Sequence, residues 1–122
     1  MKKQGTIMVA DDDPAIVDAL TLLLEDEGYR VLPAVDIETV PRVLRSMPDM
    51  LLLDIWMSGI NGGDICRKLK DEEATSSIPI IMISANRDTE EIARISGADD
   101  FLLKPFDIDD LLGKIEKYLQ KN

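Results

Sequence analysis

The chain has 122 residues, a length that fits one domain with a single substantial core. Its net charge of −10 argues against a surface for nucleic acid or anionic membranes. One cysteine excludes an internal disulfide, and the absence of histidine removes the commonest general base and most zinc sites. No apolar run has the length of a signal peptide or a membrane span, so we expect a cytoplasmic protein.

Short apolar runs predict five β-strands along the chain: TIMVA (6–10), the weaker YRVLPA (29–34), MLLLD (50–54), IPIIMIS (78–84) and DFLLK (100–104). Continuous runs of this kind suit strands that are buried on both faces. Apolar residues at helical spacing lie between and after these runs, within 16–24, 40–47, 65–69, 92–95 and 108–119. Alternating strands and helices predict an α/β fold, an open parallel sheet with helices on both faces.

Polar residues stand where these apolar runs end. Ligands of such sheets bind outside the carboxyl ends of the strands, near the point where strand order reverses. The residues that this rule selects are Asp11, Asp12, Asp54, Ser84 and Lys104. We therefore expect one site at this edge of the sheet.

Three adjacent carboxylates, Asp11 to Asp13, repel one another, and the sequence suggests what offsets the repulsion. Asp13 precedes Pro14, a pattern typical of an N-cap followed by proline at the first helical position. Asp11, Asp12 and Asp54 then remain as oxygen ligands for a hard cation such as Mg²⁺. A hydroxyl and a lysine beside a metal and a carboxylate supply what phosphoryl transfer requires.

The segments VADDDP, LLLDIWMSGINGG, IPIIMISA and GADDFLLKPF together resemble the receiver domain of bacterial two-component response regulators. The resemblance extends over essentially the entire chain, with the motifs in the family's order. It implies a flavodoxin-like three-layer sandwich with five parallel strands in the order 2-1-3-4-5 and five helices. It also implies a single receiver domain over residues 1–122, and we expect no effector domain in this chain.

The resemblance assigns a role to each site residue. Asp54 matches the aspartate that accepts a phosphoryl group, and Asp11 and Asp12 match the acidic pair that binds Mg²⁺ or Mn²⁺, with the main-chain carbonyl of Trp56. Ser84 and Lys104 match the hydroxyl and the lysine that contact the phosphoryl oxygens. The remaining matches are an aromatic switch residue, a proline after a cis bond and a turn glycine: Phe101, Pro105 and Gly62.

Some positions depart from the family pattern or are less informative. Ser58 replaces a usual proline, Phe101 lacks a tyrosine hydroxyl, and the segment between Ser84 and Lys104 is about two residues shorter than we expect.

Trp56 and Asn86 match family positions that influence the rate of dephosphorylation, and we expect the indole of Trp56 to restrict the attacking water. Other residues have simpler expected roles: a buried Cys66, an N-cap at Asp107, and a solvated turn at Asp99 and Asp100.

We therefore expect a phosphorylation-controlled switch that catalyses only its own phosphorylation and dephosphorylation. The expected partners are a histidine kinase or phosphotransfer protein and an unknown output protein. We expect neither nucleic acid nor membrane as a direct partner, and a monomer or a phosphorylation-linked dimer. Two alternatives remain: a phosphorylation-independent binding module with the same fold, and an aspartyl-phosphate hydrolase that uses Asp11 and Asp13.

Overall fold

The computed structural model describes residues 5–36, 38–57 and 60–119. Five parallel strands form the central sheet: β1 (Thr6–Ala10), β2 (Arg30–Ala34), β3 (Met50–Asp54), β6 (Ile80–Ser84) and β7 (Asp100–Leu103). They lie in the order β2-β1-β3-β6-β7, which is 2-1-3-4-5 when these strands are counted alone. The predicted fold and strand order are confirmed.

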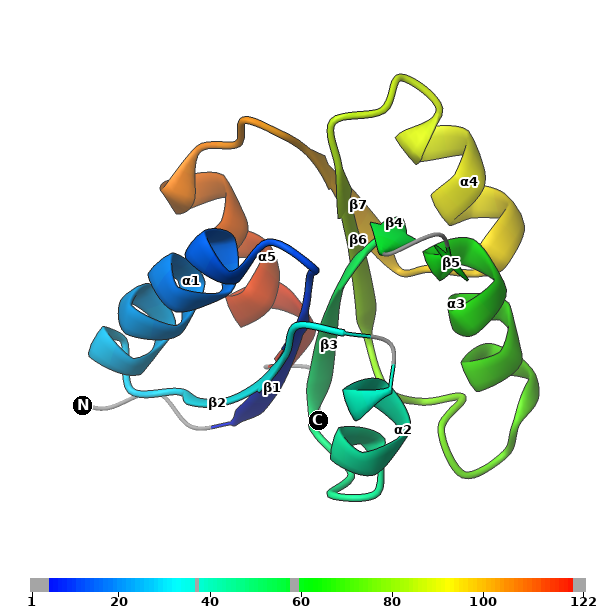
Figure 1. The fold of residues 1–122 in the computed structure, drawn as a ribbon, viewed down its shortest axis with the longest axis horizontal. Coiled ribbons are helices and arrows are strands. Elements are labelled where there is room, and N and C mark those ends of the chain that lie inside the picture. Colours follow the sequence, from blue (N-terminus) through cyan, green and yellow to red (C-terminus); the bar gives the residue numbers. More distant parts are fainter. Residues whose placement is uncertain (1–4, 37, 58–59, 120–122) are drawn as a thin grey trace.

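Helices cover both faces of the sheet (Figure 1). The helices α1 (Pro14–Asp26) and α5 (Ile108–Leu119) cover one face, while α2 (Thr39–Leu44), α3 (Gly62–Asp71) and α4 (Thr89–Ser96) cover the other. A short antiparallel pair, β4 (Trp56–Met57) and β5 (Ile60–Asn61), connects β3 to α3. The sequence pattern did not predict this pair.

Two apolar cores result from the alternation of side chains along the strands. In β3, Met50 and Leu52 pack with α1 and α5, whereas Leu51 and Leu53 pack with α2, α3 and α4. All five residues of β3 and of β6 are buried. This burial on both faces explains why these strands appear in the sequence as unbroken apolar runs.

The ends of the helices follow the sequence signals. The side chain of Asp13 accepts a hydrogen bond from the backbone of Ala15, as expected for the N-cap of α1. The side chain of Asp107 accepts from the backbone of Asp109 in the same way at the start of α5. Cys66 is fully buried, as predicted, and burial raises the pKa of its thiol to about 11.

Candidate metal and phosphoryl-transfer site

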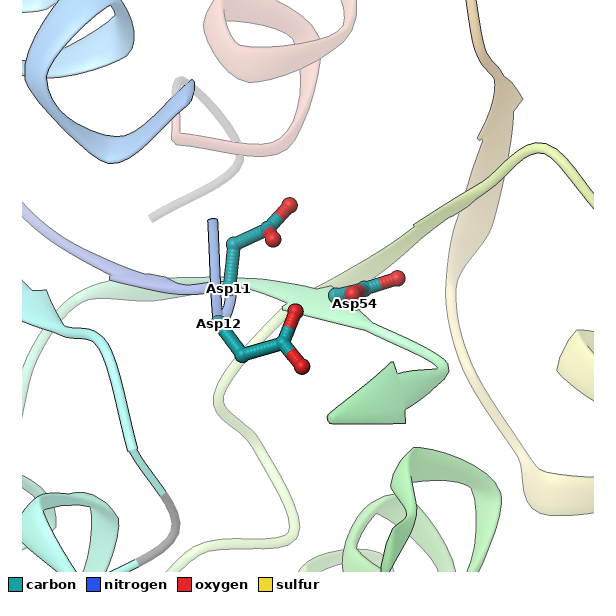
Figure 2. A group of neighbouring side chains, drawn as sticks. All are labelled: Asp11, Asp12 and Asp54. Atoms are coloured by element: carbon teal, nitrogen blue, oxygen red, sulfur yellow. The ribbon is translucent and has the colours of Figure 1, made fainter. Parts of the chain in front are cut away.

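Three carboxylates meet at the carboxyl edge of the sheet. Asp11 and Asp12 follow β1, Asp54 ends β3, and each residue offers an oxygen within 4.8 Å of the others (Figure 2). Asp11 and Asp54 are buried, while Asp12 is exposed. β1 and β3 are neighbours in the sheet, so Asp11 and Asp54 lie close together although they are 43 positions apart in the sequence.

Asp13 does not join this group, because its carboxylate caps α1. Its backbone N–H instead donates to Oδ1 of Asp11 at 3.0 Å. The run of three aspartates is therefore divided by function: one residue starts the helix and two face Asp54. This division agrees with the interpretation made from Pro14 alone.

Lys104 brings a positive charge to the same site. Its Nζ lies 2.8 Å from Oδ2 of Asp11 and 4.0 Å from Oδ1 of Asp54. The residue directly follows β7, its backbone N–H donates to the carbonyl of Ser84, and its peptide bond to Pro105 is cis, as the resemblance implied. The ammonium thus offsets part of the repulsion among the carboxylates.

Asp54 holds its proton more tightly than an ordinary aspartate. Burial raises the pKa of its carboxyl from the ordinary 3.8 to about 6, and the nearby charge of Asp11 acts in the same direction. The ammonium of Lys104 and a hydrogen bond from the backbone N–H of Trp56 oppose this shift in pKa. The site is therefore short of positive charge, and a cation bound among the carboxylates would relieve the deficit.

The donor set fits a hard divalent cation. Carboxylate oxygens are the ligands that Mg²⁺ and Mn²⁺ prefer, and Mg²⁺ sites commonly use one or two carboxylates with waters and phosphate oxygens. Asp11 and Asp12 provide two such groups beside Asp54. The residues present thus fit the cation that the sequence suggested.

Ser84 and Phe101 occupy neighbouring strands beside this site. Ser84 ends β6 and is buried, and its hydroxyl oxygen accepts a hydrogen bond from the backbone N–H of Asn86 at 3.1 Å. Phe101 is half-buried in β7, opposite Met82, and packs against the core on the α3 and α4 side. The arrangement places a hydroxyl between the strand that carries Asp54 and the strand that leads to Lys104.

Trp56 lies two residues beyond Asp54, at the start of β4. Its backbone N–H contacts the Asp54 carboxylate, and 48% of the residue's surface is exposed. Trp56 is therefore bonded to the acceptor through its backbone, while much of its surface is open to solvent. Ser58, whose replacement of proline we noted, lies outside the described residues.

Two features of the site escaped the sequence analysis. The first is the pairing of Lys104 with Asp11 in preference to Asp54, and the second is the tight approach of Gly62 to the strand that carries Asp54. A Cβ added at Gly62 would lie 2.5 Å from the carbonyl oxygen of Asp54 and 2.9 Å from Cα of Ile55. The glycine itself was the available signal, since glycine after a strand often marks a close backbone approach.

The fold and this site define a class: a doubly wound α/β domain with an acidic, lysine-containing site at the carboxyl edge of its sheet. The family described as the response regulator receiver domain matches residues 7–116. The chain belongs to this family.

Individual relatives agree with this membership. The chain is 36% identical to the transcriptional regulator RpaA of a Synechocystis species over 94% of its own length and 49% of that protein. It is 37% identical to MtrA of Mycolicibacterium smegmatis, over 95% of this chain and 51% of that protein. A crystal structure described as a response regulator from Chloroflexus aurantiacus has a TM-score of 0.87 and 30% identity, covering 97% and 99% of the two chains.

These comparisons correct one expectation about partners. RpaA and MtrA are both named as DNA-binding regulators, which contradicts our expectation that nucleic acid is not a direct partner. The chain spans about half the length of the curated relatives it matches. The expectation rested on a net charge of −10 counted over this chain, which carries no information about the half of those proteins that it does not cover.

In the part of the chain that the structure describes, no helix is both long enough and apolar enough to cross a membrane.

Proposed function

We propose that this receiver domain is a signalling switch in which Asp54 accepts a phosphoryl group. One observation carries the proposal: a buried carboxylate at the end of β3 has Lys104 at 4.0 Å and the oxygens of Asp11 and Asp12 within 4.8 Å. A buried carboxylate that served only to stabilise the fold would not require two further carboxylates and a lysine beside it, each following another strand. Family membership supports the same role.

In the proposed reaction, a carboxylate oxygen of Asp54 attacks the phosphorus of a phosphohistidine on a partner. The phosphorus–nitrogen bond breaks, a phosphorus–oxygen bond forms, and the electron pair of the broken bond stays on the imidazole. Asp11, Asp12 and the carbonyl of Trp56 would hold Mg²⁺ or Mn²⁺, which neutralises charge on the transferring group when bound. Lys104 supplies a second positive charge once it moves from Asp11 toward the phosphoryl oxygens.

These 122 residues contain no histidine, so a phosphohistidine donor lies outside them. An apolar cleft of about 460 Å³ opens beside Lys104, between α1 and the start of α5, with Ile16, Leu23 and Phe106 in its walls. Leu22 and Leu23 on α1 are exposed to 70% and 36%. Lys104 lines this cleft and its Nζ lies 4.0 Å from Asp54, so we propose that a histidine kinase or phosphotransfer protein docks there.

The consequence of phosphorylation is a changed surface rather than a released product, so the domain catalyses only its own phosphorylation and dephosphorylation. We propose that Ser84 moves its hydroxyl from the Asn86 backbone toward the phosphoryl oxygens. We propose that Phe101, half-buried on the adjacent strand, then turns inward. Such a switch shifts a two-state equilibrium that an output partner or a second copy reads.

We further propose that residues 1–122 form one receiver domain and that the switch works in the cytoplasm. The cysteine Cys66 is free and buried, which suits a reducing compartment. The hydrolase alternative receives no support, because Asp13, its second acid, is occupied as the cap of α1.

The test is intact-mass measurement after incubation with phosphoramidate, with and without Mg²⁺. We expect a Mg²⁺-dependent gain of one phosphoryl group that Asp54→Asn abolishes and the exposed control Asp18→Asn retains. No gain in conditions where a known receiver reacts would instead support a phosphorylation-independent binding module.

A further inference from the structure

A second hollow lies away from the phosphorylation site, between α2 and α3. It measures about 500 Å³, within the range of small-molecule pockets in proteins. Val40 and Leu69 line it as buried residues, while Leu44 and Ile65 face it half-buried. Leu69 stands in the last turns of α3, whereas the first residue of α3, Gly62, is the one beside Asp54. The cleft therefore shares a helix with the phosphorylation site but no residue.

The rim of this cleft is positively charged, although the chain as a whole is acidic. Arg45, at the C-terminal end of α2, and Lys68, on α3, both line the opening and are exposed. Neither has an ion-pair partner among the residues that the structure describes. Glu72 is the one acidic residue among those that form the walls. An apolar hollow with two unpaired cations at its edge is complementary to a ligand with an apolar body and an anionic head.

Two other occupants fit less well. A second copy of the chain, related by a two-fold axis through this patch, would place its own Arg45 and Lys68 close to those of the first copy. The like charges would repel one another. A partner helix is disfavoured by geometry, because α2 has six residues and rises only about 9 Å. Apolar anchors at positions i and i+7 of a docked helix span about 10.5 Å.

We propose that the α2–α3 cleft binds a small amphiphilic carboxylate, with its hydrocarbon chain between Leu44 and Ile65 and its head at Arg45 and Lys68. The proposal goes beyond the phosphoryl switch and does not depend on it. Arginine pairs well with carboxylates through two parallel hydrogen bonds, so Arg45 provides the main head-group contact. Lys68 adds a second charge from the opposite wall.

The test is a titration of the ¹⁵N-labelled protein with octanoate at physiological ionic strength, followed by amide chemical shifts. We expect saturable shifts confined to α2 and the second half of α3. Octanol, which keeps the chain but lacks the charge, should bind at least about threefold more weakly. Acetate, which keeps the charge but lacks the chain, should leave these amides unchanged. Asp54→Asn should bind octanoate as the parent does, so this result is independent of phosphorylation.

Charge variants identify the head-group contact. Arg45→Gln should weaken octanoate binding about three- to tenfold, whereas Arg42→Gln, an exposed arginine on the same helix outside the cleft, should not. Absent or scattered shifts on the parent protein would overturn the proposal, and so would octanol binding as tightly as octanoate. The comparison of ligands uses the unmodified protein, so it stands even where a variant folds poorly.

Discussion

The ammonium of Lys104 lies closer to Asp11 than to Asp54: its Nζ is 2.8 Å from the former carboxylate and 4.0 Å from the latter. The side chain of Lys104 is 21% exposed and that of Asp11 is 6% exposed, so the pair is largely shielded from water. Asp11 is one of the carboxylates expected to bind a metal ion. In this structure the ammonium of Lys104 provides the positive charge beside it. The same lysine is proposed to contact the phosphoryl group, so it must leave Asp11 during activation.

The first prediction concerns the stability that this pair provides. Lys104→Met leaves Asp11 buried beside Asp54 without its ammonium, so we expect the free energy of unfolding to fall by about 1–3 kcal/mol in EDTA. Urea unfolding at pH 7.5 measures the loss. Millimolar Mg²⁺ should recover part of it, because the ion supplies the missing charge. Lys68→Met, which removes an exposed lysine on α3, should change stability by less than about 0.5 kcal/mol. Equal stability of the two variants in EDTA would contradict the role of the pair.

The second prediction concerns pH and Asp54. The pKa of this carboxyl is about 6 in the folded protein and 3.8 ordinarily, so the folded state favours the protonated form. The stability that this preference contributes is present below about pH 4 and is lost as the pH rises through 6. Asp54→Asn has no charge to bury, so in EDTA it should unfold at a higher temperature than the parent at pH 8. The advantage should be at most about 3 kcal/mol and should disappear near pH 4.

Thermal unfolding followed by circular dichroism from pH 4 to pH 8 checks this pH dependence. Asp71→Asn is the matched control, because Asp71 is an exposed carboxylate at the end of α3. A difference between Asp54→Asn and the parent that stays constant across the whole range would argue against a raised pKa.

The strands and the residues at their ends were predictable because each depends on local sequence. An unbroken apolar run such as 50–54 defines a strand buried on both faces, and parallel strands in such a sheet bring their carboxyl ends together. Asp11, Asp12, Asp54, Ser84 and Lys104 therefore followed from position alone. The boundaries differed only slightly: the fourth predicted strand starts at Ile80 in the structure and not at Ile78.

What could not be predicted depends on side-chain geometry between distant residues. Lys104 and Asp11 are 93 residues apart, and no sequence signal distinguishes Asp11 from Asp54 as the partner of the lysine. Asp99 shows the same limit, since we expected it to solvate a turn. Its Oδ2 instead accepts hydrogen bonds from Nζ of Lys70 and the backbone N–H of Ile80, each at 2.8 Å. The expectation was wrong because both donors come from elements that only the folded chain brings near.

The third prediction compares two glycines. Gly62→Ala would place a Cβ 2.5 Å from the carbonyl oxygen of Asp54, so the backbone must shift. We expect a loss of about 2–4 kcal/mol in stability and slower phosphorylation, because the displaced strand end carries the acceptor. Gly113→Ala, in α5, meets nothing within 4 Å and should stabilise the protein by about 0.5–1 kcal/mol. Chemical unfolding and the rate of phosphoramidate labelling measure both effects. A Gly62→Ala protein that matches the parent in both would show that this approach does not position Asp54.

The fourth prediction rests on the proposed phosphorylation and concerns its lifetime. Trp56 lies two residues after Asp54, its backbone N–H donates to the Asp54 carboxylate, and 48% of its surface is exposed. A bulky ring restricts the water that hydrolyses the phosphoaspartate, so Trp56→Asn should shorten the lifetime. We expect about a three- to tenfold change, equivalent to about 0.7–1.4 kcal/mol in the activation barrier. The decay of the phosphorylated mass after removal of phosphoramidate measures it. Trp56→Phe keeps an aromatic ring and should decay like the parent, whereas decay of Trp56→Asn no faster than the parent would show that the indole only covers the loop.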